Sequence, residues 1–489
     1  MKTLDMTRPL SFLFAGLAAA TLAVAPGLAF DDHEGGDEDD GDAYYAIVGG
    51  DIYTGTGEVL RGATLLSKNG KIHEIGYELY LPEGTETLDA TGLRLYPGMV
   101  ALSATSNLSQ GNFAPGLEFH DFTPHEDDHS ICGDCGKFYE EIVPAAVDPG
   151  EVSTTHLAVE GFRTDFDDSF DPFGGYMVMA LANGITTAEQ SNVAIKLKRG
   201  EIEGVSLSES QLTSFQWSGS NPSGKTDLRQ KFRDGYQYLR DMRLWEELDK
   251  DVRGDEPSKR GIDSRVLSVL EGKTLARFSS NEQGDLLGIA RLAQQYGFRP
   301  VIQGAVEGWV VADELGRAGA YAIVNPRVRR DPNERLAHPN GSSIENAALL
   351  SAAGVQVAIV PSNTRIDLGG SAGRDLLGLA LEAGFAIRGG LAEHRALQGI
   401  TTVPARMLGI DHRVGTLEVG KDADVVVADG DLLHYQTLVQ YTVVEGKLVY
   451  DKAEEIFYAH IRPRTTEEVV DPGEEAPADE ESVEESVED

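Results

Sequence analysis

The feature that most constrains the fold is a continuous apolar run that follows a Pro-Gly turn. Residues 93–106 read LRLYPGMVALSATS, and Pro97-Gly98 ends a strand-rich opening. Met99 then begins an uninterrupted apolar run, which is typical of a strand buried on both faces. Such strands belong mostly to parallel sheets that are covered by helices, so a larger α/β domain is expected to begin at residue 99.

Short strands are predicted on either side of this domain. Residues 44–98 alternate apolar runs with turn signals, and Asn69-Gly70 indicates a hairpin turn. Near the other end, residues 415–431 read GTLEVGKDADVVVADGD and residues 441–451 read YTVVEGKLVYD. Both ends of the chain are therefore expected to be rich in strands, with alternating strands and helices between them.

This order of segments resembles the amidohydrolase superfamily, and imidazolonepropionase-like amidohydrolases in particular. In those relatives Gly-Lys-Asp-Ala-Asp precedes a buried strand and Val-x-Gly-Lys follows it, as in residues 420–447 here. Residues 401–405, Thr-Thr-Val-Pro-Ala, are similar to the family's Thr-x-Asn-Pro-Ala. The resemblance implies an α/β fold, a (β/α)8 TIM-like barrel with a small composite β-sandwich built from both ends of the chain.

The expected domain organisation follows from these boundaries. We expect a signal peptide, an acidic linker, a composite β-sandwich in two pieces, a barrel with a long polar insertion, and an acidic disordered tail. In the same order, these are residues 1–29, 30–43, 44–98 with 411–464, 99–410 with the insertion 107–171, and 465–489.

The family's metal ligands are replaced at each place where its motifs can be followed. Relatives write Asp-x-His-x-His after Pro-Gly and two apolar residues, and residues two apart on a strand face the same way. Ala101, Ser103 and Thr105 hold those three places. The two later histidines fall at Ser279 and Gly304, and neutral hydroxyls are poor zinc ligands.

Three further residues complete the predicted pocket at the former ligand positions. Ser362 stands near the place of the family's metal-binding aspartate, and Glu307 matches the Glu of its His-Gly-Thr-Glu-Gly motif. Lys196 lies near the place of a metal-bridging lysine in some relatives, or it is an ordinary lysine at a strand end. No residue is assigned a catalytic role, and no cofactor is predicted.

The only two cysteines lie in the polar insertion. Cys132 and Cys135 form a CxxC pair beside His125 and His129. In an exported protein this pair favours a disulfide, whereas with the two histidines it can make a separate four-ligand metal site. Both interpretations stay open, and zinc is the alternative cofactor.

The N-terminus and the charge predict where the protein acts. Lys2, Arg8, an apolar segment over 10–24 and Gly27-x-Ala29 are typical of a secretory signal, with an uncleaved anchor as the alternative. An exported protein, periplasmic or extracellular, is therefore expected, with no membrane association after cleavage. Residues 31–42 hold eight acidic residues and residues 465–489 hold 12, within a net charge of -38. Such acidity argues against nucleic acid as a partner.

Two functions are compatible with these patterns. The first is a catalytically silent barrel, a pseudoenzyme, that binds a small-molecule ligand or a paralogous subunit, as a homo- or heterodimer. The second is an active hydrolase of C-N (non-peptide) bonds in cyclic or linear amides, with a rebuilt metal site. The substituted ligand positions favour the first, and the histidines of the insertion favour the second.

Overall fold

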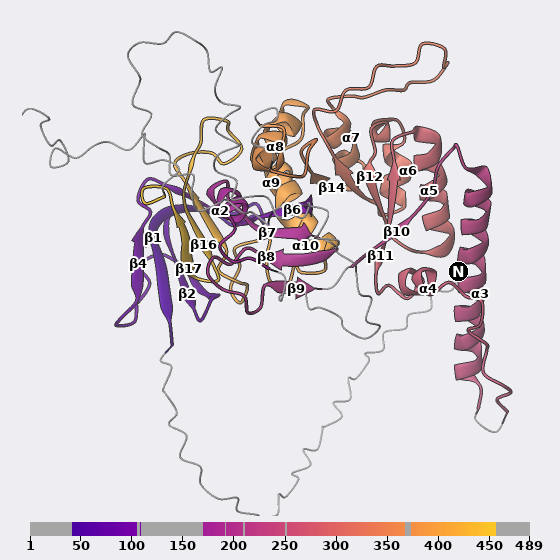
Figure 1. The fold of residues 1–489 in the computed structure, drawn as a ribbon, viewed down its shortest axis with the longest axis horizontal. Coiled ribbons are helices and arrows are strands. Elements are labelled where there is room, and N and C mark those ends of the chain that lie inside the picture. The colour runs from indigo at the N-terminus through magenta and orange to yellow at the C-terminus, as the bar shows by residue number, and fades with distance from the viewer. Residues whose placement is uncertain are drawn as a thin grey trace, which may run out of the picture. The chain divides into compact units, whose positions relative to one another are not determined.

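A computed structural model describes residues 42–104, 108, 170–190, 192–208, 211–249, 252–366 and 373–455. The predicted signal peptide, nearly all of the acidic linker, most of the insertion and the acidic tail lie outside these residues. The described strands form three sheets of eight, four and five strands (Figure 1).

The eight-stranded sheet is built from both ends of the chain. Its order is β17-β16-β15-β5-β1-β2-β3, with β4 paired to β1. The antiparallel pairing of β15 with β5 joins the two halves. Asn69 and Gly70 both have positive φ, as a tight hairpin turn between β2 and β3 requires, so this predicted turn is confirmed. The strands are β1 (Tyr44–Tyr53), β2 (Val59–Lys68), β3 (Lys71–Gly76), β4 (Glu86–Asp89), β5 (Arg94–Pro97), β15 (Val425–Ala428), β16 (Val439–Val444) and β17 (Lys447–Asp451).

The apolar run after Pro97-Gly98 forms β6 of the four-stranded sheet. This sheet comprises β6 (Met99–Ala104), β7 (Ile185–Gln190), β8 (Val193–Lys196) and β9 (Ser206–Ser208). All six residues of β7 are buried, and α2 (Gly175–Ala182) precedes it. Strands β6 and β7 are parallel, whereas β8 and β9 each run antiparallel to the strand before.

The five-stranded sheet is entirely parallel and alternates with helices. Its strands, in spatial order, are β10 (Leu212–Phe215), β11 (Leu275–Ser280), β12 (Pro300–Gly304), β13 (Tyr321–Val324) and β14 (Gln356–Ile359). The helices are α3 (Pro222–Glu247), α4 (Ser264–Leu270), α5 (Gln283–Tyr296), η2 (Gly308–Val310), α6 (Ala312–Arg317), α7 (Asn346–Ala352), η3 (Leu376–Gly378), α8 (Leu379–Arg388), α9 (Glu393–Ile400) and α10 (Thr402–Met407). Parallel strands require such crossovers.

Local sequence explains where the longer helices begin and end. Asn221 accepts a hydrogen bond from the Gly224 N–H, and Pro222 occupies the first turn, so α3 begins there. Helix α5 ends at Gly297, which has a left-handed conformation that glycine adopts without strain. Among the described residues, no helix combines the length and the apolar character needed to cross a membrane.

The described strands do not close the expected eight-stranded ring. They divide into the four- and five-stranded sheets because β8 and β9 run antiparallel, whereas a (β/α)8 ring needs parallel neighbours throughout. The two sheets nevertheless share one buried apolar cluster. Its strand residues are Val100, Leu102, Ala194, Leu212, Val301, Tyr321, Ile323 and Ala358. On β12 and β13 these residues alternate with residues of a second cluster, which also contains residues of the helices.

Candidate functional site: a buried ion pair at the end of strand β6

An ion pair links the two smaller sheets next to Ser103. The Arg277 guanidinium, on β11, donates from Nη2 to Glu189 Oε2, on β7, over 2.8 Å. The same Nη2 lies 3.3 Å from Ser103 Oγ, at the end of β6, and the Ser103 N–H donates to Glu189 Oε2 over 2.9 Å. The side chains of Glu189 and Arg277 are only 3% and 11% exposed. These three residues are called the strand-end site below.

The backbone at Ser103 is unusual. Its φ of 56° lies in the left-handed region, which non-glycine residues rarely adopt. The pairing of β6 with β7 also shifts register between Ala101 and Ala104, as at a β-bulge. The bulge lets the Ser103 N–H reach the Glu189 carboxylate instead of a neighbouring backbone carbonyl. Backbone strain of this kind is found at functional sites, where surrounding contacts hold it in place.

Sequence reasoning did not find Glu189 and Arg277. A signal was present, because each is a charged residue in a strand of otherwise uncharged residues, ITTAEQ and LARFSS. Buried charges in such positions need a partner, and opposite charges on two strands favour each other. What the sequence did not reveal was that two residues 88 positions apart would meet.

The residues at the strand-end site do not fit a divalent metal ion. Ser103 offers a neutral hydroxyl, which is a poor metal ligand, and the Arg277 guanidinium beside it places a positive charge there. The only carboxylate, Glu189, is already bound to that guanidinium. Within the part of the chain that the structure describes, no group of three His, Cys, Asp or Glu side chains is arranged to hold a metal.

The other predicted ligand positions lie in several different environments. Ala101 is buried in a different apolar cluster from its neighbours Val100 and Leu102. Ser279 is exposed on β11, and Ser362 is exposed after β14, where its hydroxyl donates to the Arg374 carbonyl. The structure therefore brings only Ser103 of this set into the strand-end site. Thr105 and the candidate ligands His125, His129, Cys132 and Cys135 lie outside the described residues.

Gly304 ends β12 in a conformation that a histidine would not adopt easily. Its φ is 101°, and a Cβ atom there would lie 2.3 Å from Asn281 Oδ1. A side chain at this position would therefore require the backbone or Asn281 to move.

Lys196 ends β8 and is the centre of a buried charge cluster. Its side chain is 0% exposed and forms ion pairs with Asp422, Asp424 (3.3 Å) and Glu445 (3.1 Å). Burial alone would lower the pKa of Lys196, but the three carboxylates raise it above its ordinary value. The two aspartates belong to the Gly-Lys-Asp-Ala-Asp motif. The motif therefore fastens the β8 end to the eight-stranded sheet, and the ion pairs of Lys196 are made with residues outside the strand-end site.

The carboxylates of this cluster differ in protonation behaviour. Burial would raise the pKa of Asp422, but Lys196 and Arg413 hold it below its ordinary value. Glu445 behaves likewise, because Lys196 and Lys198 outweigh burial. For the fully buried Asp424, burial dominates and raises the pKa despite Lys196.

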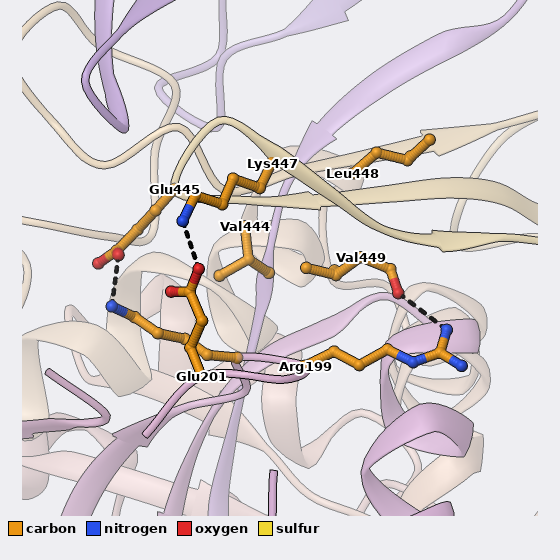
Figure 2. A pocket seen from close by; sticks show the side chains of 8 residues that line it. Arg199, Glu201, Val444, Glu445, Lys447, Leu448 and Val449 are labelled. Carbon is orange, nitrogen blue, oxygen red and sulfur yellow. Dashed lines mark hydrogen bonds and ion pairs between the residues drawn. The ribbon is translucent and has the colours of Figure 1, made fainter. Parts of the chain in front are cut away.

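A cavity of about 220 Å³ adjoins this cluster (Figure 2). Figure 2 shows Lys447 facing Glu201 across it, while Arg199 donates to the Val449 carbonyl oxygen. Lys198 binds Glu445 over 2.6 Å. Because these charged groups already have partners, a ligand would have to break an ion pair to bind them.

Glu307 supports a loop and does not face Lys196. Its carboxylate accepts the N–H of Gln283, the first residue of α5, and the N–H of Gly341, each over 3.0 Å. It is 5% exposed. The predicted pocket residues Lys196 and Glu307 are thus each bound to other groups.

Comparisons with other proteins agree with this architecture. A profile of the Amidohydrolase family matches residues 311–450. The crystal structure of an amidohydrolase from Thermotoga maritima MSB8 has a TM-score of 0.57 and 21% identity, covering 83% of this chain and all of that one. At this identity the likeness concerns the fold.

Two curated relatives match over short segments. Amidohydrolase tasK of Hapsidospora irregularis is 34% identical over 84 residues, which are 17% of this chain and 9% of the relative. N-acetylglucosamine-6-phosphate deacetylase of Danio rerio is 41% identical over 68 residues, 14% of this chain and 16% of the relative. The chain thus spans less than a fifth of either relative. The family profile thus matches the C-terminal part of the chain, and the fold over most of its length is similar to that of a solved amidohydrolase.

Proposed function

We propose that this chain is a catalytically silent member of the amidohydrolase superfamily that binds a small-molecule ligand or a paralogous subunit. One observation supports the proposal: the Arg277–Glu189 ion pair contacts Ser103, a residue that the sequence resemblance assigns to the place of a metal-binding histidine. A metal supplies activated water in such enzymes, and no hydroxyl or guanidinium group here can lower the pKa of water comparably. The strand-end site keeps a charged, preorganised structure without that chemistry.

The proposal includes the finer architecture and the location. We infer that the two smaller sheets correspond to a distorted (β/α)8 barrel, since they share one apolar cluster. The eight-stranded sheet corresponds to the composite sandwich. The signal-like N-terminus supports export to a periplasmic or extracellular location. The net charge of -38 supports partners other than nucleic acid.

The alternative is an active amide hydrolase with a rebuilt metal site. Its support is the set His125, His129, Cys132 and Cys135, which has ligand chemistry suited to zinc. The deacetylase relative hydrolyses an amide by its name, so N-acetylglucosamine-6-phosphate is a reasonable first assay substrate for this alternative.

Metal binding distinguishes the two functions. The purified chain is incubated with zinc, dialysed, and measured by elemental analysis, beside a Cys132→Ser, Cys135→Ser variant. If the strand-end site is catalytically silent, the cysteine variant should retain no zinc. Neither the unaltered chain nor the variant should then hydrolyse the acetylated sugar phosphate. Stoichiometric zinc that survives the cysteine changes, together with amide hydrolysis, would overturn the proposal.

A further inference from the structure

A second cavity lies between the eight-stranded sheet and helix α9. Its volume is about 250 Å³. For comparison, an engineered apolar cavity of about 150 Å³ can hold benzene. The cavity in this protein is lined by the end of β1 and the loop after it, by β5, by α9 and by the segment after β15. None of these residues belongs to the strand-end site, and nothing in the superfamily resemblance assigns this cavity a role.

One wall of the cavity is rigid and largely apolar. The rings of Tyr53 and Tyr96 are stacked with centroids 4.7 Å apart and an interplanar angle of 21°. Tyr96 is 2% exposed, and Leu397 on α9 is 7% exposed. Leu433 completes the apolar surface. Side chains that are already packed lose little freedom when a ligand binds beside them.

The charged groups around the cavity are predominantly negative. Three acidic residues line it from separate segments, namely Glu58, Glu393 and Asp431, beside the guanidinium of Arg94 and the imidazole of His394. Arg94 lies 5.8 Å from the Tyr53 ring centroid and interacts with the Tyr96 hydroxyl. Among the described residues, the side-chain carboxylates of Glu58 and Glu393 have no hydrogen-bond or ion-pair partner.

The rim that carries Glu58 is held in place by hydrogen bonds. The Thr54 N–H and hydroxyl both donate to the Glu58 carbonyl over 3.1 Å. Gln398, on α9, donates from Nε2 to the Gly55 carbonyl over 3.1 Å. The loop after β1 is therefore fastened to the helix that supplies Glu393, and the two carboxylates are presented on a preorganised frame.

We propose that this cavity binds a small organic cation, an amine with a compact apolar or aromatic body. The unpartnered carboxylates attract the ammonium group, and the tyrosine and leucine side chains bury its body. The described carboxylates here are not arranged to hold a metal ion, which favours an organic cation. This inference does not depend on whether the strand-end site is silent.

Three probes of similar size and different charge test the proposal on the unaltered full chain. Benzylamine, benzyl alcohol and benzoate are titrated by calorimetry and by ligand-detected NMR. Benzylamine is expected to bind at least tenfold more tightly than the other two, because only its charge complements the cavity. Equal binding of benzyl alcohol, or no binding of benzylamine, would overturn the proposal.

A pair of variants locates the binding. Glu58→Gln with Glu393→Gln removes both unpartnered charges at exposed positions and keeps side-chain volume, and it should weaken benzylamine binding at least tenfold. Glu345→Gln, an exposed glutamate beside α7, is the matched control and should bind as the unaltered chain does. Unchanged affinity in the double variant, with an unchanged thermal midpoint, would show that benzylamine binds elsewhere and refute the assignment.

Discussion

At the scale of single residues, the charges that matter most are buried ones with several partners. Lys196 has no exposed surface and contacts three carboxylates, while Arg413 and Lys71 bind Asp422 from other sides, over 2.8 and 3.1 Å. Such a cluster is costly to desolvate, so its net contribution to stability is modest. Removing Lys196 alone is expected to lower stability much more, because its carboxylate partners would stay buried without their cation.

Lys196→Met should therefore destabilise the protein strongly. Methionine keeps the apolar stem but leaves three carboxylates without their central cation, at a cost of about 3–5 kcal/mol. Lys447→Met is the control, since Lys447 is 66% exposed and its ion pair with Glu201 should contribute little. Urea unfolding of both variants measures the difference. Equal small losses would mean that the Lys196 cluster is solvated in solution.

At the scale of elements, Glu307 connects three segments. It lies between β12 and η2, and its two carboxylate oxygens hold the first turn of α5 and the loop at Gly341. Gly341 has a φ of 87°, and a Cβ there would lie 2.9 Å from the Arg330 carbonyl. Glu307 and Gly341 thus help to set the path of segment 326–345, together with the hydrogen bonds between Arg330 and Ser342.

Glu307→Gln should loosen this segment. The amide oxygen of glutamine can still accept one of the two backbone N–H groups. The amide NH2 group would face the other N–H, and two donors facing each other cost about 1–3 kcal/mol. Trypsin should then cleave faster after Arg329, Arg330 or Arg335, because local opening exposes the backbone. Glu314→Gln, at a glutamate side chain that is 38% exposed, serves as the control. Identical digestion patterns for all three proteins would contradict the proposed role of Glu307.

At the scale of the whole molecule, buried ion pairs cross the boundaries between sheets. Glu189 and Arg277 join the four-stranded sheet to the five-stranded sheet, and Lys196 joins the four-stranded sheet to the eight-stranded one. Backbone hydrogen bonds hold the strands together within each sheet. The ion pairs add contacts between the sheets, and these contacts depend on the charge of the side chains. Stability should consequently depend on pH.

The sign of the pH dependence is defined for Asp422 and Glu445, whereas the raised pKa of Asp424 acts in the opposite direction. The pKa values of Asp422 and Glu445 are lowered from 3.8 and 4.5 in the folded state, so their stabilisation is present above pH 4.5. It is lost as the pH falls through the folded-state values. The deficit of Lys196→Met should therefore shrink below about pH 4, since protonation relieves its unpaired carboxylates. Urea unfolding between about pH 7 and pH 3 measures how much stability Lys196→Met loses at each pH. A loss that is the same at every pH would contradict the coupling between these carboxylates and stability.

Much of the architecture was determined by the sequence itself. The hairpin at Asn69-Gly70, the buried strand from Met99 and the alternation of strands and helices follow from local turn chemistry and hydrophobic period. The joining of both chain ends in one sheet followed from a motif, Gly-Lys-Asp-Ala-Asp, that has a fixed structural context in the superfamily.

Only the tertiary structure decided which buried charges pair with each other. Arg277 and Glu189 meet because β6, β7 and β11 bring their ends together, and no local pattern encodes a contact over 88 residues. The motif aspartates were recognisable, but their partner Lys196 lies 226 residues before Asp422. The departure from a closed ring came from the antiparallel β8 and β9, whose direction depends on which neighbour each strand pairs with. Hydrophobic period sets which face of a strand is buried, whereas charge pairing and strand direction depend on contacts that form only when the whole chain folds.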